Sequence, residues 1–218
     1  MGQYYTDTLS ARNLEKCYEI APPRIRQYID AEIEFVLNSS QSTDRILELG
    51  CGYGRVLREL RKVTPNIVGL DISLGSLLYG HMKTEVQLAQ MDARTTGFKD
   101  NSFDVVVCIQ NGISAFKVNP VELVKESLRI TVDGGKCLFS TYSDKIWEER
   151  LSWFELQAKE KLLGEIDREK TVRGTIVCKD GFVATTFSKD DFRRIANELE
   201  VSCEIKEVDS SSLFGIFS

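Results

Sequence analysis

Histidine, tryptophan and proline are scarce in this sequence of 218 residues, which contains one, two and four of them. The single histidine, His81, excludes a metal site built on two histidines and gives no support to a catalytic triad centred on histidine. The six cysteines include no Cys-x-x-Cys pair. We therefore expect no metal site, and we expect reduced thiols rather than disulfides.

Long hydrophobic runs are also missing. The strongest apolar run, residues 105–109, has the length of a strand, whereas a membrane-spanning helix needs about 18 apolar residues. Residues 1–5 contain no basic region followed by an apolar stretch, so no signal peptide is expected. These absences predict a cytoplasmic protein with no membrane partner.

Positive charge is in deficit, with 28 Lys and Arg residues against 33 Asp and Glu residues and a net charge of −5. Such a chain lacks the broad positive field on which non-specific nucleic-acid binding depends. Arg55, Arg58, Arg61 and Lys62 lie close together, and we interpret them as a solvated helix face. Nucleic acid is therefore not expected as a partner.

Strand and helix patterns alternate along a chain of ordinary globular composition, with 42% hydrophobic and 28% charged residues. Helices are expected over residues 9–18, 24–37, 75–84, 120–130, 144–169 and 188–199, and directly after Gly54. Strands are expected over residues 45–49, 67–70, 86–89, 103–109, 136–142, 201–208 and 213–217, with a further hairpin over 171–178 and 182–186. This alternation predicts an α/β fold with a mostly parallel sheet.

The most informative segment is residues 48–54, ELGCGYG, between a predicted strand and a predicted helix. Glycines there permit positive φ and let a ligand approach the main chain, and the helix that follows presents unpaired backbone N–H groups. In an α/β sheet the carboxyl end of a strand is where ligands bind. The segment therefore predicts a ligand-binding turn.

Two classes of cofactor compete for this turn. The dinucleotide pattern G-x-G-x-x-G would need its third glycine at Arg55, where an arginine is too bulky, so a dehydrogenase is disfavoured. The observed spacing is G-x-G-x-G, with Glu48 two residues upstream of Gly50. This arrangement resembles motif I of the class I S-adenosylmethionine-dependent methyltransferases.

Later segments extend the resemblance. In that family an acid ending the second strand binds both ribose hydroxyls, and Asp71 stands there, about 20 residues after the glycines. Asp92, after the third strand, would accept a hydrogen bond from the adenine amino group. Gln110 and Asn111, after the fourth, would lie near the methionine part. Residues 133–135, DGG, match the turn before the fifth strand.

The resemblance implies a fold, a cofactor and a set of site residues. The fold is Rossmann-like, a doubly wound seven-stranded sheet that is mostly parallel, with an antiparallel C-terminal strand and helices on both faces. The cofactor is S-adenosyl-L-methionine, and S-adenosyl-L-homocysteine is the product. The cofactor-binding residues would be Glu48, Gly50, Cys51, Gly52, Gly54, Asp71, Ile72, Ser73, Asp92, Ala93, Gln110 and Asn111. We interpret Cys51 as a neutral lining residue, although a thiol near a helix N-terminus can have a lowered pKa.

The chain is predicted to be a single domain over residues 1–218. Its parts would be an N-terminal helical cap (1–40), a cofactor-binding core (44–142), an insertion acting as a substrate lid (143–187), and a C-terminal helix and strand pair (188–218). Tyr4, Tyr5 and Tyr142 are candidates for facing the acceptor. Trp147 and Trp153 would either pack the insertion onto the sheet, close over the acceptor or form a homodimer contact.

The expected reaction is methyl transfer by in-line displacement to a small-molecule acceptor with an O, N or C nucleophile. Orienting the reactants is the main requirement, so no catalytic residue is assigned. After the fourth strand the chain has Gln110-Asn111-Gly112-Ile113 rather than the Asn/Asp-Pro-Pro-aromatic motif of amino-group methyltransferases, and it contains no Pro-Cys dipeptide. It resembles the small "type 11" group, which includes quinone-biosynthesis enzymes. An RNA or protein methyltransferase and a non-catalytic S-adenosylmethionine-binding regulator are the alternatives.

Overall fold

The computed structural model describes the backbone of residues 3–218 and the side chains of Tyr4 and of residues 6–218. Its centre is a seven-stranded sheet in the order β3-β2-β1-β4-β5-β9-β8. Strand β9 is antiparallel to both of its neighbours, and β1 to β5 run parallel, which confirms the predicted fold class. The strands are β1 (Ile46–Leu49), β2 (Ile67–Asp71), β3 (Gln87–Gln90), β4 (Phe103–Cys108), β5 (Thr131–Tyr142), β8 (Cys203–Val208) and β9 (Ser212–Phe217).

Helices cover both faces of the sheet. Buried residues of α3, α4 and α8 form one core with the sheet, and those of α6, α7 and α9 form a second core on the opposite face. The helices are α1 (Gln3–Asp7), α2 (Ala11–Glu19), α3 (Pro23–Asn38), α4 (Arg55–Leu60), α5 (Leu74–His81), α6 (Gly112–Ala115), α7 (Pro120–Ile130), α8 (Trp147–Lys159) and α9 (Lys189–Leu199).

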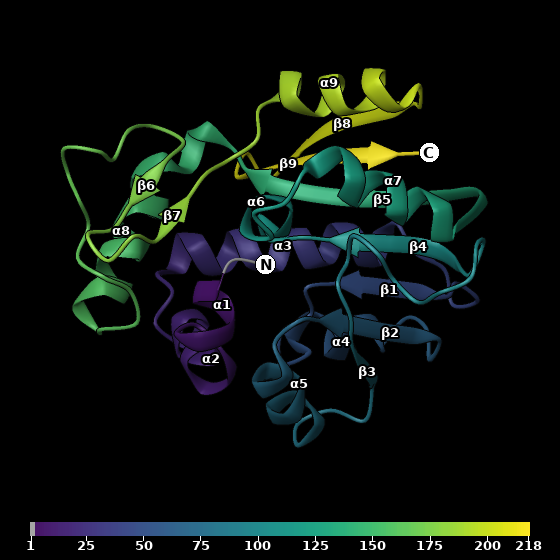
Figure 1. Cartoon of the computed structure of the whole chain (residues 1–218), viewed down its shortest axis with the longest axis horizontal. Helices are drawn as coiled ribbons and strands as arrows, with labels where there is room; N and C mark the ends of the chain where they lie inside the picture. The colour runs from purple at the N-terminus through teal and green to yellow at the C-terminus, as the bar shows by residue number, and fades with distance from the viewer. Residues whose placement is uncertain (1–2) are drawn as a thin grey trace.

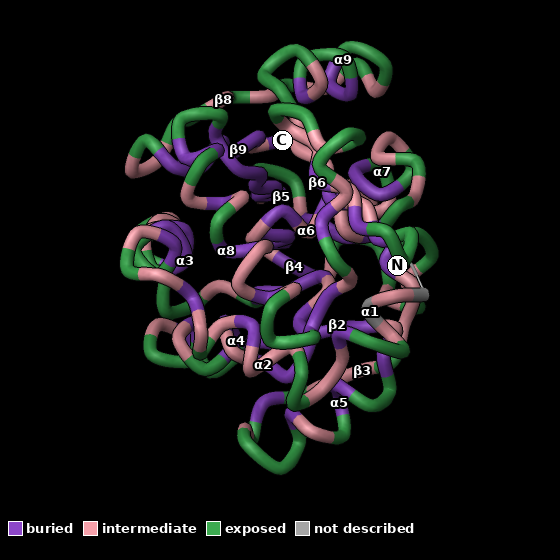
Figure 2. Tube along the Cα trace, turned by 90° about the vertical axis from the view of Figure 1, so that its left-hand side faces the viewer, coloured by how far each residue is buried: buried purple, intermediate pink, exposed green. Residues whose placement is uncertain are grey.

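Strand β4 shows why its sequence is a continuous apolar run. Val105 and Val107 belong to the core under α3 and α4, while Val106 and Cys108 belong to the core under α7 and α9. Because side chains alternate along a strand, a strand covered on both faces needs apolar residues at every position. In Figure 2 the buried part of the chain is concentrated in the strands, with exposed turns of helix around it.

The order of the strands determines where a ligand can bind. From β1 the chain proceeds outward to β2 and β3, and it then returns to place β4 on the other side of β1. This reversal opens a crevice outside the carboxyl ends of β1 and β4. In Figure 1 the arrowheads of β1 and β4 point toward the side where α1, α2, α8 and the β6–β7 hairpin gather.

The expected turn at residues 133–135 is a bulge inside a longer strand. Strand β5 begins at Thr131, directly after α7, and its pairing with β4 shifts from Phe103–Thr131 to Val105–Lys136. Gly134 has φ +79°, which lets the extra residues leave the ladder without ending the strand. The glycines therefore interrupt the register of one strand and do not separate two elements.

The insertion is less helical than the sequence predicts. Helix α8 ends at Lys159, whereas helix was expected to residue 169. The chain turns at Lys161, which has φ +59°, and packs Gly164 where a Cβ would lie 2.3 Å from the Asp180 carboxyl carbon. The predicted hairpin is present, but its strands β6 (Ile176–Val177) and β7 (Val183–Ala184) are only two residues long.

Candidate active site

The glycine turn after β1 is held by its neighbour β2. Gly50, Gly52 and Gly54 have φ values of +71°, +54° and +77°, so all three adopt the left-handed backbone that favours glycine. The N–H of Gly50 donates to the Leu70 carbonyl at 2.8 Å. The N–H of Gly52 donates to Asp71 Oδ2 at 2.9 Å. The turn is therefore built around the end of β2.

Asp71 is buried, with 2% of its surface exposed. Its second oxygen accepts a hydrogen bond from the Ser73 N–H at 2.8 Å, and the Ser73 hydroxyl caps α5 by accepting from the Ser76 N–H. Burial raises the Asp71 pKa, and the backbone N–H groups of Ser73 and Gly52 oppose that rise. A carboxylate has about four lone-pair directions, so Asp71 can still accept from two ligand hydroxyls.

Glu48 lies at the end of β1 with an oxygen that has no partner. Its side chain is buried, and Oε2 makes no hydrogen bond to any described residue. Burial raises the Glu48 pKa to about 8, opposed by the positive charge of Arg55 and reinforced by the nearby Asp71 carboxylate. A buried carboxyl with an unsatisfied oxygen indicates a place for a cationic or donor group of a ligand.

Arg55 and Gln110 supply donors beside this carboxyl. The Arg55 guanidinium carbon lies 4.0 Å from the centre of the Tyr18 ring, and one of its N–H groups donates to Gln110 Oε1. Arg55 Nε and Gln110 Nε2 are buried atoms without a partner among the described residues. Three unsatisfied polar atoms thus come from the ends of β1 and β4 and the start of α4.

These residues line a cavity of about 130 Å³. Because the strand order is β2-β1-β4-β5, its wall runs from the polar side chains at β1 and β2 to the aromatic side chains at β5 and in the insertion. The polar end comprises Glu48, Gly50, Gly52, Asp71 and Ser76. The aromatic end comprises Phe116, Tyr142, Trp153, Phe154 and Phe182.

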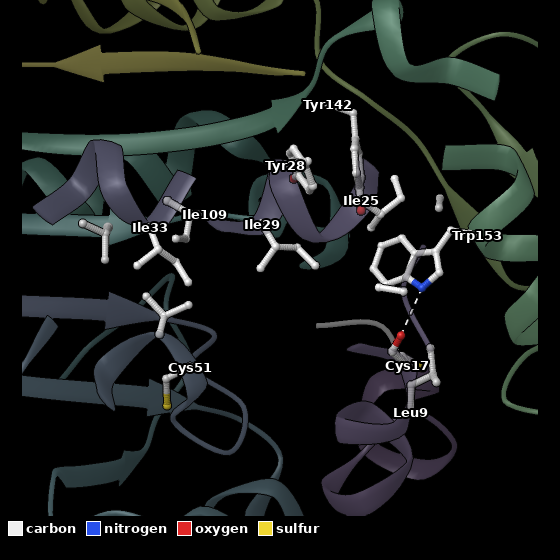
Figure 3. Packing of buried hydrophobic residues seen from close by; sticks show 14 of the residues in the cluster. Leu9, Cys17, Ile25, Tyr28, Ile29, Ile33, Cys51, Ile109, Tyr142 and Trp153 are labelled. Carbon is white, nitrogen blue, oxygen red and sulfur yellow. Dashed lines mark hydrogen bonds between the residues drawn. The ribbon is translucent and has the colours of Figure 1, made fainter. Parts of the chain in front are cut away.

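The N-terminal segment, residues 3–19, closes the cavity together with the insertion. Figure 3 shows the Trp153 indole N–H donating to the Cys17 carbonyl at 3.0 Å. The Tyr4 hydroxyl donates to Asp180 at 2.7 Å, and the Ala11 N–H donates to the Ser76 hydroxyl at 3.0 Å. Small-molecule pockets usually measure about 300–1,000 Å³. A larger ligand therefore requires this segment to move.

Leu14 shows how closely the segment approaches the glycine turn. A Cβ added to Gly52 would lie 2.9 Å from Leu14 Cδ2. Glu15, one residue further along α2, accepts from the Tyr79 hydroxyl on α5 and from Lys83, which follows that helix. The N-terminal segment is therefore attached both to the insertion and to α5, and it covers the turn between them.

The predicted site residues fall into two groups. Those that line the cavity are Glu48, Gly50, Cys51, Gly52, Asp71, Gln110 and Tyr142. Gly54 is the N-cap of α4, Ile72 follows β2 with its carbonyl accepting from Gln90, and Ala93 is buried in the core under α7 and α9. Burial raises the pKa of the Cys51 thiol well above its usual value, so the prediction of a neutral lining group matches its surroundings.

Four other predicted residues have different surroundings. Asp92 is ion-paired with Arg94 at 2.7 Å, and that pair lowers the Asp92 pKa. The Asn111 amide accepts from the Thr141 hydroxyl and donates to the Thr185 carbonyl, which ties β4 to the insertion. Tyr4 contacts Asp180 rather than the cavity. The Tyr5 side chain lies outside the described residues.

Tyr18, in the N-terminal segment that the sequence offered for the acceptor pocket, lines the cavity from α2. Sequence reasoning missed one contributor to the site. Glu32 is a fully buried acid on α3, and its carboxylate accepts from the Gln110 N–H at 2.6 Å and from the Ser212 hydroxyl. Burial raises the Glu32 pKa to about 7. An acid between Ile29 and Ile33 on an apolar helix face was the available signal.

The polar end suits the parts of S-adenosylmethionine. The unpaired Glu48 oxygen matches an ammonium group, Asp71 matches a ribose diol, and the left-handed glycines leave room for close approach to the main chain. The residues that the structure describes contain no cluster of three His, Cys, Asp or Glu side chains suited to a metal ion.

Comparison with known proteins agrees with this fit. Residues 47–139 match the methyltransferase domain family. A protein of Methanocaldococcus jannaschii described as uncharacterized is 29% identical over 136 residues, 62% of this chain, and the match spans about half, 49%, of that relative. A ubiquinone biosynthesis O-methyltransferase of Colwellia psychrerythraea is 25% identical over 180 residues, 72% of this chain and 68% of that protein.

Solved structures share the fold at low sequence identity. A putative S-adenosyl-L-methionine-dependent methyltransferase of Methanococcus maripaludis has a TM-score of 0.67 at 18% identity, covering 96% of this chain and 93% of that one. A methyltransferase of Thermotoga maritima, described as a possible histamine N-methyltransferase, has a TM-score of 0.65 at 16% identity, covering 100% and 99%. Residues 47–139 therefore match a methyltransferase domain, and these solved structures share the fold of the chain.

Proposed function

We propose that the cavity holds S-adenosylmethionine at its polar end and a small-molecule methyl acceptor at its aromatic end. S-adenosylmethionine supplies a methyl group on a positively charged sulfur, so the group is already activated for displacement. The observation that carries the proposal is the continuity of the cavity from Asp71 to Tyr142 and Trp153. Once enlarged by movement of the covering segment, one continuous space would hold both reactants in line, and orientation alone can supply ~7–11 kcal/mol of a barrier.

Each residue of the polar end would bind a different part of the cofactor. Asp71 would accept from the two ribose hydroxyls, and Glu48 Oε2 would accept from the ammonium group of the amino-acid part. Gly50 and Gly52 would let the main chain approach the cofactor closely. Asp92 would reach the adenine amino group only if its ion pair with Arg94 opens. The aromatic side chains opposite would exclude water.

A small acceptor suits the cavity better than a macromolecule. The N-terminal segment and the insertion meet over the cavity through Tyr4–Asp180 and Trp153–Cys17, so the site is a covered chamber. Two relatives are named for O-methyl transfer in ubiquinone biosynthesis, which favours a small acceptor with an oxygen nucleophile. No helix within residues 3–218 has the length and apolar character to span a bilayer. A cytoplasmic location remains part of the proposal.

Calorimetric titration with S-adenosylhomocysteine and S-adenosylmethionine tests the cofactor assignment, with NAD as the negative ligand. Asp71→Asn is expected to weaken S-adenosylhomocysteine binding about 10- to 100-fold, because hydrogen bonds to a charged group contribute ~1.5–3 kcal/mol. Asp133→Asn, on the exposed bulge of β5, is the matched control and should bind like the parent. If the parent and Asp71→Asn bind S-adenosylhomocysteine equally well, Asp71 does not bind the cofactor.

A further inference from the structure

The described side chains at the aromatic end of the cavity include no group that ordinarily takes a proton at neutral pH. The carboxyls in the described lining are Glu48 and Asp71, and both belong to the polar end. Burial raises the pKa of Cys17 to about 12, and burial also raises the pKa of Tyr18. His81 lies on the exposed side of α5, outside the described lining. Glu32 lies behind this lining with its oxygens engaged by Gln110 and Ser212, so an acceptor that had to lose a proton would find no free base among the described lining residues.

The junction of the polar and aromatic ends carries a positive charge. Arg55, the cationic side chain in the described lining, lies beside Glu48 and stacks on Tyr18, whose ring centre is 6.2 Å from that of Trp153. Arg55 Nε and Gln110 Nε2 are buried donors without partners among the described residues. Two unsatisfied donors, one of them charged, match an anionic oxygen best, because charge-assisted hydrogen bonds are about twice as strong as neutral ones.

We propose that the methyl acceptor is an aromatic acid that arrives already ionised, with its anionic oxygen recognised by Arg55 and Gln110 and its ring against the aromatic end. This inference rests on the proposed function, because it concerns the acceptor side of the same cavity. A carboxylate or an acidic phenolate belongs to this class. An amine does not, because it carries a proton in solution, would need a base and would be repelled by Arg55.

The transfer step balances without a proton acceptor. The anionic oxygen forms a bond to the methyl carbon while the bond from that carbon to sulfur breaks, and the electron pair of the broken bond stays on sulfur. One negative and one positive charge disappear together, and no proton is released. Arg55 lowers the nucleophilicity of the oxygen somewhat, but it selects and orients the ionised form.

A carboxylate bound to Arg55 could belong either to the acceptor or to the amino-acid part of the cofactor. The two sources are distinguished by saturating the protein with S-adenosylhomocysteine first, so that any cofactor carboxylate is already in place. The probes are then benzoate, benzamide and benzylamine, which share one ring and differ in charge.

In ligand-observed NMR titrations we expect benzoate to bind at least tenfold more tightly than benzamide, and we expect no binding of benzylamine. Arg55→Gln should reduce benzoate affinity to that of benzamide, while Arg55→Lys, which keeps the charge, should retain part of the preference. Arg58→Gln is the matched control, since Arg58 lies on the same helix with its side chain exposed. Arg58→Gln should bind S-adenosylhomocysteine like the parent, whereas Arg55→Gln should weaken that binding no more than a few-fold, because it loses the charge that lowers the Glu48 pKa. Circular dichroism shows that all three variants are folded.

Each of the other outcomes would contradict either the proposed acceptor class or the proposed function. Equal binding of benzoate and benzamide, preference for benzylamine, or binding of none of the three would overturn the aromatic-acid acceptor. Loss of S-adenosylhomocysteine binding in Arg55→Gln would assign Arg55 to the cofactor and would likewise overturn it. Failure of the parent protein to bind S-adenosylhomocysteine would instead contradict the proposed function itself.

Discussion

Glu48 is the residue whose protonation a bound cofactor must change. Burial raises its pKa to about 8, so at pH 7 the unliganded carboxyl is mostly protonated. An ammonium group placed against the unpaired Oε2 would favour the ionised form and lower that pKa. Binding at neutral pH would therefore release a proton from Glu48.

The affinity for S-adenosylhomocysteine is thus expected to rise with pH and to level off near pH 8. Below the Glu48 pKa, the association constant should rise by at most about tenfold per pH unit, because one proton leaves on binding. Calorimetry in two buffers of different ionisation enthalpy counts that proton. Glu48→Gln should bind more weakly and without proton release.

Glu34→Gln, on the exposed side of α3, is the control for this prediction and should keep the slope of the parent. Glu32 is the other buried acid nearby, with a pKa raised to about 7, but its oxygens are engaged by Gln110 and Ser212. If Glu48→Gln keeps the pH dependence of S-adenosylhomocysteine affinity, Glu32 rather than Glu48 would be the group that loses the proton.

The sequence could bring Glu48, the glycines and Asp71 together because they belong to one βαβ unit, whose parallel strands end at the same edge. It could not bring Arg55 to Tyr18, because that contact depends on how α2 crosses the mouth of the cavity. Asn111 shows the converse: its motif position suggested the cofactor, but Thr141 and Thr185 take up its amide.

At the scale of elements, the packing of α5 on the glycine turn positions the polar end. Gly80 lies where an added Cβ would come within 2.9 Å of the Tyr53 backbone, whereas a Cβ at Gly75 would meet nothing within 4 Å. Both glycines are in the same helix. They form a matched pair for separating helix propensity from close packing.

Gly75→Ala is expected to raise the free energy of unfolding by ~0.5–1 kcal/mol, because alanine favours helix over glycine. Gly80→Ala is expected to lower it by ~1–3 kcal/mol, because the backbone of the turn must shift to admit the methyl group. Urea denaturation gives both values, and Gly80→Ala should also weaken S-adenosylhomocysteine binding. A stabilising Gly80→Ala would show that α5 does not constrain the turn.

Element boundaries were predictable where the apolar pattern and the turn chemistry agree, as at β4 and at α9, whose Ser188–Asp191 capping box is present. They were wrong where tertiary contacts override the local pattern. The glycines at 133–135 were expected to end an element, yet pairing with β4 continues past them. Helix α8 ends at Lys159, and beyond it Gly164 packs closely against Asp180, which is 16 positions further along the chain.

At the scale of the whole molecule, two segments far apart in the sequence cover the site that the central strands build. Residues 3–19 contact the insertion over the cavity, and they are also bonded to α5. A cavity of about 130 Å³ in this arrangement is too small for a cofactor and an acceptor together. We therefore expect the N-terminal segment to open before binding, and the observed affinity would then be reduced by the fraction of molecules that are open.

The Tyr4 hydroxyl is a contact that favours the closed arrangement, since it donates to Asp180 at 2.7 Å and accepts from the Gly164 N–H at 3.3 Å. Tyr4→Phe removes both bonds and should increase the rate of S-adenosylhomocysteine association about 3- to 10-fold, the ratio that ~0.7–1.4 kcal/mol represents. Stopped-flow fluorescence of Trp153, which lines the cavity, measures that rate. Ser202→Ala removes a hydroxyl hydrogen bond to Ser218 away from the cavity and should leave the rate unchanged. An association rate in Tyr4→Phe equal to that of the parent would mean that the segment opens by another route, with Ala11, which has φ +50° and donates to Ser76, as the contact to vary next.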